Sequence, residues 1–166
     1  MKTNLLLLAI LFFLGTSSFA ASSPFDDASA AYERGDYVQA MKLFSALAKQ
    51  GHQWAQRRVG SMYAEGKGAP QDYQEAVKWY RLAAAQGNQF AQINLGVMYT
   101  NGTGVRQDFV RAHMWFNLAA AALSGDSGDT ATKNRDRIVS KMTAEQIGTA
   151  QEMARRCQES KLKNCD

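Results

Sequence analysis

"HQWAQRRVGSMYAEGKGAPQDYQEAVKWYRLAAAQG", residues 52–87, is followed directly by "NQFAQINLGVMYTNGTGVRQDFVRAHMWFNLAAAAL", residues 88–123. The two stretches are identical at 16 of 36 aligned positions. A shorter unit at 24–51 shares the second half of the pattern, since Asp36, Tyr37 and Ala40 recur 36 residues later. Self-similarity at a fixed period is the signature of a repeat array. The sequence therefore predicts about three units.

Each unit is expected to form two helices. The first helix of residues 52–87 has one apolar face, made by Ala55, Val59, Met62 and Tyr63. Gly66 and Gly68 end that helix, because glycine readily takes positive φ. Asp72 stands where the second helix needs an N-cap, and Asp108 does so in the next unit. The buried stripe of the second helix is Ala76, Trp79, Tyr80 and Ala83.

Small residues and tryptophans predict how the helices pack. We expect Gly60 and the alanines to let two helix backbones approach closely, while Trp79 and Trp115 fill the space between units. One helical hairpin cannot bury its own apolar face, so the units must stack.

These residues resemble the Sel-one-like repeat (SLR) family, which is related to the tetratricopeptide repeats. The resemblance rests on "AQRRVGSMYAEGKGAPQDYQEAVKWYRLAAAQG" and "AQINLGVMYTNGTGVRQDFVRAHMWFNLAAA". Residues 24–51 look more like a tetratricopeptide unit, because the GxG loop is missing there. The resemblance implies an all-α fold, a right-handed α-α superhelix of about three helix-turn-helix repeats whose first helices line a concave surface. Family members usually act as adaptors or scaffolds, and many are exported bacterial proteins.

The two ends of the chain have other roles. Lys2, the apolar run from Leu5 to Leu14 and the small residues before Ala20 predict a signal peptide at 1–20, cut near Ala20. The apolar run is too short to span a bilayer, so we expect secretion or a periplasmic location and no membrane insertion after cleavage. Residues 21–123 are then the repeat array, and 124–166 a C-terminal cap.

Two helices are expected in the cap, a charged pair that covers the exposed end of the array. The first is predicted from about Gly128 to Met142, with Ile138, Val139 and Met142 on its apolar side. Thr143 and Gln146 have the spacing of a capping box for the second. The apolar side of this second helix is Ile147, Ala150, Met153 and Ala154. The cap also resembles the C-terminal cap of many exported SLR proteins.

Cys157 and Cys165 are the two cysteines of the chain. An even number of cysteines in an exported protein predicts one disulfide. A continuous helix would hold their Cα atoms about 12 Å apart, beyond disulfide reach. The last helix must therefore stop near Ser160 and turn back. A metal site needs more ligands than two thiols, and a redox pair normally has the closer CxxC spacing.

Composition excludes some partners. The chain has 19 Lys and Arg against 15 Asp and Glu, a formal net charge of +4, and the two signs are interspersed. Nucleic-acid binding would need a concentrated basic stripe, so we expect no nucleic-acid partner. We expect no cofactor and no metal, and a monomeric protein.

Groove positions follow from the analogy with tetratricopeptide geometry. The analogy places a binding groove on the first helices of the units, at Trp54, Arg57, Ser61, Glu65, Phe90, Ile93, Val97 and Asn101, with Phe25, Ser29, Tyr32 and Glu33 upstream. An apolar strip beside a polar one suits an extended peptide or a helix of a protein partner. A second interpretation is that Trp54 and Phe90 simply pack against the preceding unit.

Three motifs suggest other chemistry. "GDSGD" at 125–129 resembles the nucleophile region of chymotrypsin-like proteases, and His52 or His113 would be its base. A catalytic triad is defined by geometry, and a helical chain offers no such frame, so we expect Asp126 or Ser127 to be a helix N-cap. "NGT" at 101–103 is formally a glycosylation acceptor but lies in the GxG loop, where it predicts a turn. The three tryptophans could form a sugar platform, yet at this spacing Trp79 and Trp115 are expected in the core.

Three functions are compatible with these observations. The first is a non-enzymatic adaptor or regulator, exported to the bacterial periplasm or outside the cell, that binds a protein or peptide. The second is an enzyme that binds or hydrolyses β-lactams, as has been linked to cysteine-rich relatives, although those carry a disulfide in each repeat. The third is a peptidoglycan or glycan binder that uses Trp54 and Phe90.

Overall fold

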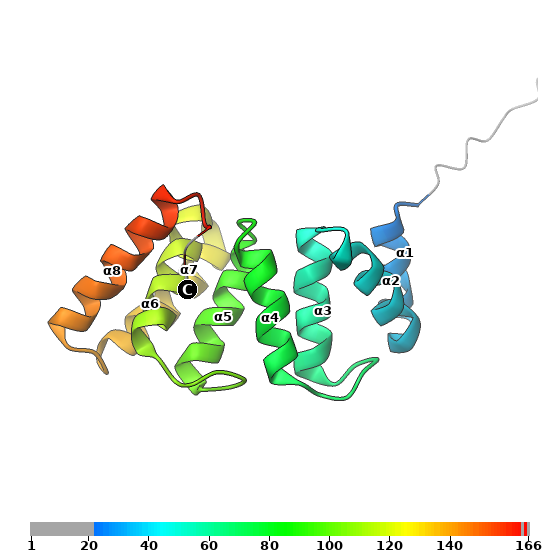
Figure 1. Cartoon of the computed structure of the whole chain (residues 1–166), viewed down its shortest axis with the longest axis horizontal. Coiled ribbons are helices and arrows are strands. Elements are labelled where there is room, and N and C mark those ends of the chain that lie inside the picture. Colours follow the sequence, from blue (N-terminus) through cyan, green and yellow to red (C-terminus); the bar gives the residue numbers. More distant parts are fainter. Residues whose placement is uncertain (1–21, 164, 166) are drawn as a thin grey trace, which may run out of the picture.

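A computed structural model of the chain describes residues 22–163 and residue 165. These residues form helices joined by short loops, which confirms the all-α prediction (Figure 1). The helices are α1 (Pro24–Glu33), α2 (Tyr37–Lys49), α3 (Gln53–Glu65), α4 (Tyr73–Ala84), α5 (Gln89–Asn101), α6 (Phe109–Ala122), α7 (Gly125–Val139) and α8 (Ala144–Glu159). The predicted signal peptide at 1–20 lies outside the described residues.

The helices lie in a row that follows the sequence, from α1 and α2 at one end to α7 and α8 at the other (Figure 1). Within the repeats, α1 packs on α2, α3 on α4, and α5 on α6. Each pair also contacts the next, through α2 with α3 and through α4 with α5. At the far end α6 contacts both α7 and α8, so the last repeat is covered by two further helices.

Helix boundaries within the repeats follow the predicted signals. Asp72 accepts hydrogen bonds from the backbone N–H groups of Gln74 and Glu75, both at 2.9 Å, and Asp108 accepts one from Arg111 at 3.0 Å. Gly66 ends α3 and Gly102 ends α5, each in the left-handed conformation. The "NGT" segment is therefore the turn that was predicted.

The second glycine of each GxG loop has a role that the sequence did not indicate. A Cβ atom on Gly68 would lie 2.2 Å from the carbonyl oxygen of Tyr37, and one on Gly104 would lie 2.3 Å from that of Tyr73. Both tyrosines begin the second helix of the preceding unit. The loop of each unit is thus pressed against the backbone of the unit before it.

The buried residues form two clusters. One joins the first repeat to α3, around Phe44, Val59 and Met62, all of them fully buried. The other runs from α4 to the C-terminal tail, and Trp115 lies in it with 2% of its surface exposed. Trp115 is thus the core residue that was predicted, while Trp79 is half-buried and packs against the first cluster.

Gly60 and Gly96 accommodate aromatic rings. A Cβ on Gly60 would meet the Tyr80 ring at 2.8 Å, and a Cβ on Gly96 would meet the Phe116 ring at 2.5 Å. These rings belong to the second helix of the same unit. The two helices approach each other closely, as predicted. The nearest contacts are between an aromatic ring of the second helix and the backbone of the first.

The start of the cap differs from the prediction. Helix α7 begins at Gly125, so all of "GDSGD" is helical, and the helix ends at Val139 rather than Met142. The expected N-cap at Asp126 or Ser127 is wrong, because Ser124 occupies that position, without a side-chain cap hydrogen bond. Gly128 is buried, and a Cβ there would lie 2.7 Å from the Leu123 carbonyl oxygen. This close contact needs a glycine inside the helix, where propensity alone disfavours one.

The C-terminal prediction is confirmed. Thr143 and Gln146 form the capping box of α8, which ends at Glu159. The chain then turns back, and a disulfide joins Cys157 to Cys165 with their Cα atoms 4.8 Å apart. A disulfide of this kind is typical of oxidising compartments. Over the described residues, no helix has both the length and the apolar character needed to span a membrane.

Candidate functional site

The predicted groove residues lie on α3 and α5. The two helices begin and end alike: His52 caps α3 by accepting the N–H of Ala55 at 3.3 Å, and Asn88 caps α5 by accepting that of Ala91 at 3.0 Å. Both helices end at a left-handed glycine. Because the helices are equivalent, residues 36 apart occupy the same position on each. We call the surface formed by the predicted positions on α1, α3 and α5 the first-helix face.

Aromatic rings meet at the beginning of α3 and α5. The rings of Trp54 and Phe90 lie 6.0 Å apart, tilted by 49°, and the Arg57 guanidinium lies 5.8 Å from the Phe90 ring centre. Trp54 keeps 39% and Phe90 37% of its surface exposed. Phe90 thus packs against the preceding unit, as the second interpretation expected, whereas the ring contact of Trp54 is with the following unit. Both rings remain accessible.

Arg57 is a partly buried cation on this face. Burial, together with the nearby charge of Arg58, holds the pKa of Arg57 below its ordinary value. Within the described part of the chain, its buried Nε has no hydrogen-bond partner. A buried donor without a partner has an energetic cost.

A pocket of about 330 Å³ opens further along the same face. Val97 and Asn101, both predicted groove residues, line it with Asn94 of the same helix and with Tyr80 of α4. The remaining lining residues are Ala64, Tyr73, Met98 and Thr103. Tyr80 donates a hydrogen bond of 3.4 Å to the Ser61 hydroxyl. Burial raises the pKa of Tyr80, although the bond to Ser61 acts against it, so the phenol is neutral near pH 7. The pocket thus combines an apolar wall with neutral polar groups.

Two further predicted residues are engaged within the protein. Ile93 is half-buried and packs against the core. Glu65 accepts a hydrogen bond from the Tyr32 hydroxyl at 3.2 Å and forms an ion pair of 2.7 Å with Lys67, the middle residue of the GxG loop. Lys67 in turn donates to the Tyr32 hydroxyl at 2.8 Å. Burial acts to raise the pKa of Glu65, but the hydrogen bond and charge of Lys67, together with hydrogen bonds from Tyr32 and Ser61, outweigh it, so the pKa is lowered.

The upstream residues of α1 divide into structural and accessible positions. Phe25 stacks on the His52 ring with a centroid separation of 5.1 Å and contacts Phe44 edge to face at 5.3 Å. Ser29 donates to the Phe25 carbonyl oxygen at 2.9 Å. Glu33 is exposed. Tyr32 therefore links the α1 end of the first-helix face to α3, while Phe25 belongs to the core.

The sequence model of the Sel1 repeat matches residues 29–52, 55–88 and 89–122. The chain belongs to the Sel1 repeat family. The three matched segments overlap the units read from the 36-residue period, and the first unit, which looked more like a tetratricopeptide repeat, is also matched as a Sel1 repeat. Sel1 repeat proteins typically serve as interaction modules and are usually non-catalytic. No curated protein matches the chain.

Two solved structures are similar to this Sel1 repeat protein. One is c5321, described as a protective antigen present in uropathogenic Escherichia coli strains and displaying an SLR fold. It shares 30% identity with a TM-score of 0.77 over 86% of this chain, and the match spans 30% of its own length. The other, a Sel1 repeat protein from Oxalobacter formigenes, shares 33% identity with a TM-score of 0.57. That match covers 61% of this chain and 40% of the other.

The two histidines that could serve as a protease base have structural places in the Sel1 array. His52 uses Nδ1 to cap α3, and His113 is buried on α6 with 3% of its surface exposed. Across residues 22–163, no hydrogen bond joins Ser127 to either histidine. Burial, followed by the charge of Arg135, lowers the pKa of His113.

Three features of the face were not found from the sequence. These are the place of Tyr80 in the pocket, the place of Asn94 beside it, and the ion pair of Lys67 with Glu65. Asn94 and Tyr80 belong to different units, and the ion pair depends on how the GxG loop folds. The recurrence of tyrosine or phenylalanine at position 80 and its 36-residue equivalent was the available signal for Tyr80.

Proposed function

We propose that this Sel1 repeat protein is a non-enzymatic interaction module, an adaptor or regulator exported to the bacterial periplasm or outside the cell, which binds a peptide segment of a protein partner on its first-helix face. The observation that carries the proposal is the pocket of about 330 Å³ beside Val97 and Asn101. The family is typically one of interaction modules. The disulfide supports an oxidising location.

The geometry suits an extended peptide with one apolar anchor. An apolar side chain would enter the pocket against Val97, where Asn94 and Asn101 offer amide donors and acceptors to the peptide backbone. Arg57 would donate to a carbonyl or carboxylate further along the peptide. The exposed edges of Trp54 and Phe90 would cover the remaining apolar surface. Anchors of this kind give affinity, and the polar contacts fix direction.

Peptide selection tests the proposal. A random-peptide phage library is panned against the purified protein, and enriched peptides are synthesised and titrated by fluorescence anisotropy. Val97→Glu places a charge at the pocket and should weaken binding at least about tenfold, since a buried unpaired charge is costly. Val38→Glu is the matched control, because Val38 is 73% exposed on α2. Failure to enrich any peptide, or equal binding by both variants, would refute the proposal.

A glycan or peptidoglycan ligand is the second candidate, favoured by the exposed Trp54 and Phe90 rings. Aromatic faces are good platforms for apolar ligand surfaces. Cosedimentation with purified murein that is lost in Trp54→Ala and kept in Val97→Glu would support this candidate over the peptide. Hydrolysis of a chromogenic β-lactam tests the enzyme alternative. The repeats of this chain carry no cysteine, unlike the cysteine-rich relatives that have been linked to β-lactams.

A further inference from the structure

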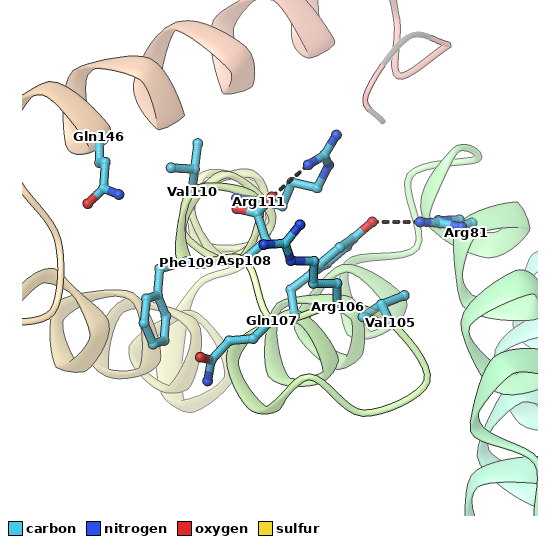
Figure 2. A pocket seen from close by; sticks show the side chains of 10 residues that line it. Arg81, Val105, Arg106, Gln107, Asp108, Phe109, Val110, Arg111 and Gln146 are labelled. Carbon is cyan, nitrogen blue, oxygen red and sulfur yellow. Dashed lines mark hydrogen bonds and ion pairs between the residues drawn. The ribbon is translucent and has the colours of Figure 1, made fainter.

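Two of the pockets of this protein lie against α6 and outside the first-helix face. The larger has a volume of about 600 Å³ and lies at the beginning of α6, where Arg111 donates to Asp108 at 2.6 Å (Figure 2). The smaller has a volume of about 310 Å³ and lies at the end of α6. We call this smaller pocket the α6-end pocket. Its walls come from the beginning of α5, the end of α6, α8 and the C-terminal tail.

Gln92 gives the α6-end pocket a buried hydrogen-bond acceptor. Gln92 lines the pocket and is 2% exposed, and its Nε2 donates to the Ala84 carbonyl oxygen at 3.4 Å. That bond fixes the orientation of the amide, because only the nitrogen end can donate to a carbonyl. Over the described part of the chain, the buried Oε1 of Gln92 has no hydrogen-bond partner. A buried acceptor in this state has an energetic cost.

The preceding repeat shows how the same acceptor is satisfied. Gln56, 36 residues before Gln92, is 5% exposed and donates in the same way to the Ala48 carbonyl oxygen, at 3.1 Å. The Oε1 of Gln56, however, accepts a hydrogen bond of 2.7 Å from Nε2 of Gln86. The residue 36 positions after Gln86 is Ala122, which lines the α6-end pocket. The pocket therefore lies where the preceding unit holds a glutamine side chain.

The other lining residues favour a neutral ligand. Leu118 and Leu162 are apolar, and Gln89 and Gln158 carry amides. None of the described residues that line the pocket carries a charge. A charged group placed beside Gln92 would thus lose its hydration without gaining a counter-ion, which is costly. A primary carboxamide on a methylene stem has the neutral N–H donor and the apolar surface that this pocket can accommodate.

The C-terminal tail holds one wall of the pocket in place. Leu162 follows α8, and its backbone N–H donates to the Cys157 carbonyl oxygen at 2.9 Å. The disulfide between Cys157 and Cys165 closes the chain around Leu162. A Cβ on Gly87 would lie 3.6 Å from Cδ1 of Leu162, so the tail reaches the loop between α4 and α5. The wall opposite the end of α6 is therefore built by a tied segment of the chain.

We propose that the α6-end pocket is a second binding site, which takes the side chain of a glutamine on a protein partner. The amide N–H of that glutamine donates to Oε1 of Gln92, as Gln86 donates to Gln56 in the preceding unit. Its methylene groups contact Leu118 and Leu162. Because the described lining residues are not those of the first-helix face, the site goes beyond the proposed function and can be tested separately.

A defined peptide tests this site. The probe is a pentapeptide with one central glutamine between alanines, acetylated and closed by an N-methylamide, so that the glutamine carries its only primary carboxamide. The readout is the side-chain amide signal of Gln92 in spectra of the ¹⁵N-labelled protein. We expect a saturable shift with this peptide. Binding should be at least about fivefold weaker when glutamate replaces the glutamine, since a carboxylate offers no amide donor.

Ala122→Gln supplies the missing donor from the protein itself. Ala122 is exposed, so a longer side chain can be accommodated there. The urea midpoint of this variant should rise, and its Gln92 signal should no longer respond to the peptide. Ala121→Gln is the matched control, because Ala121 is the neighbouring exposed alanine of α6 and is not one of the lining residues described. This control should bind the peptide within about twofold of the unchanged protein, because it leaves the hydrogen bond to Gln92 intact.

Val97→Glu separates this site from the proposed function, because Val97 belongs to the first-helix face. That variant should keep the response of Gln92 to the peptide. Equal binding of the glutamine and glutamate peptides would overturn the proposal, and so would a response that persists in Ala122→Gln or is lost in Ala121→Gln or Val97→Glu. No shift at peptide concentrations up to about 10 mM would also overturn it, even with a more stable Ala122→Gln, as would a response to N-acetylglucosamine alone.

Discussion

Replacing Gly104 with alanine should weaken the array at the contact between two repeats. Gly104 has a φ of +70°, and a Cβ there would lie 2.3 Å from the Tyr73 carbonyl oxygen and 2.6 Å from its carbonyl carbon. Real Cβ atoms do not approach backbone this closely, so the loop must move away from α4. The substitution therefore combines an unfavourable backbone conformation with the loss of a contact between units.

The two costs can be estimated separately. A non-glycine residue in the left-handed conformation destabilises the folded state by roughly 1 to 2 kcal/mol. Alanine also lowers the conformational entropy of the unfolded chain, which offsets about 0.4 to 1 kcal/mol of that cost. Overpacking adds typically about 1 to 3 kcal/mol. The free energy of unfolding should thus fall by about 3 kcal/mol. With a urea m-value of about 2 kcal/mol per molar, the midpoint should shift down by about 1.5 M.

Gly125 provides the matched control. Its φ is +62°, and a Cβ there would have no heavy atom within 4 Å. Gly125→Ala should therefore show only the backbone cost, about 1 kcal/mol or a midpoint shift of about 0.5 M. Urea unfolding of both variants, followed by circular dichroism at 222 nm, measures the difference. Gly68→Ala should match Gly104→Ala, because its Cβ would lie 2.2 Å from the Tyr37 carbonyl oxygen.

Equal midpoints for Gly104→Ala and Gly125→Ala would refute this reasoning. Such a result would mean that the GxG loop moves away from α4 without an energetic cost. The second glycine would then be needed only for its positive φ and not for the close contact with the preceding unit. A loss in Gly104→Ala without a similar loss in Gly68→Ala would contradict the equivalence of the two junctions.

Further predictions concern the cap and the buried histidine. Changing Cys157 and Cys165 to serine should cost about 2 to 3 kcal/mol in urea unfolding under oxidising conditions, and no loss would show that the tail is held by packing alone. His113 has a lowered pKa through burial and Arg135, so stability is full above about pH 6.5 and should fall as the pH drops toward 5. His113→Gln should reduce this dependence of the free energy of unfolding on pH. An unchanged dependence would show that other groups cause it. Ser127→Ala should change the free energy of unfolding by less than about 0.5 kcal/mol, since Ser124 and not Ser127 occupies the N-cap position of α7; a larger loss would show that Ser127 caps the helix.

Local signals in the sequence were sufficient for most helix boundaries. The caps at Asp72 and Asp108, the capping box at Thr143 and the left-handed Gly66 and Gly102 depend on residues close together in the chain. The turn after α8 followed from the reach of a disulfide. The beginning of α7 was missed because it depends on the contact of Gly128 with Leu123, where a close backbone approach outweighs the low helix propensity of glycine.

The candidate sites were less predictable than the fold. The groove positions Val97 and Asn101 came from the repeat register, and they do line a pocket. Ile93 has the same register but packs inward, since the contacts between α5 and its neighbours decide burial. The hydrogen bond from Arg81 on α4 to Tyr99 on α5 was not predicted, because it crosses the repeat boundary. Contacts between units cannot be read from one unit.

The second glycine of the GxG loop, which packs against the helix of the preceding unit, also determines how the chain can be lengthened. The unit at residues 52–87 offers Gly68 to the unit before it and the carbonyl of Tyr73 to the unit after it. A duplicated copy of that segment, inserted after Gly87, would satisfy both neighbours without any change elsewhere. In-frame duplication by 36 residues can therefore lengthen the protein, whereas insertions of other lengths would leave one junction mismatched.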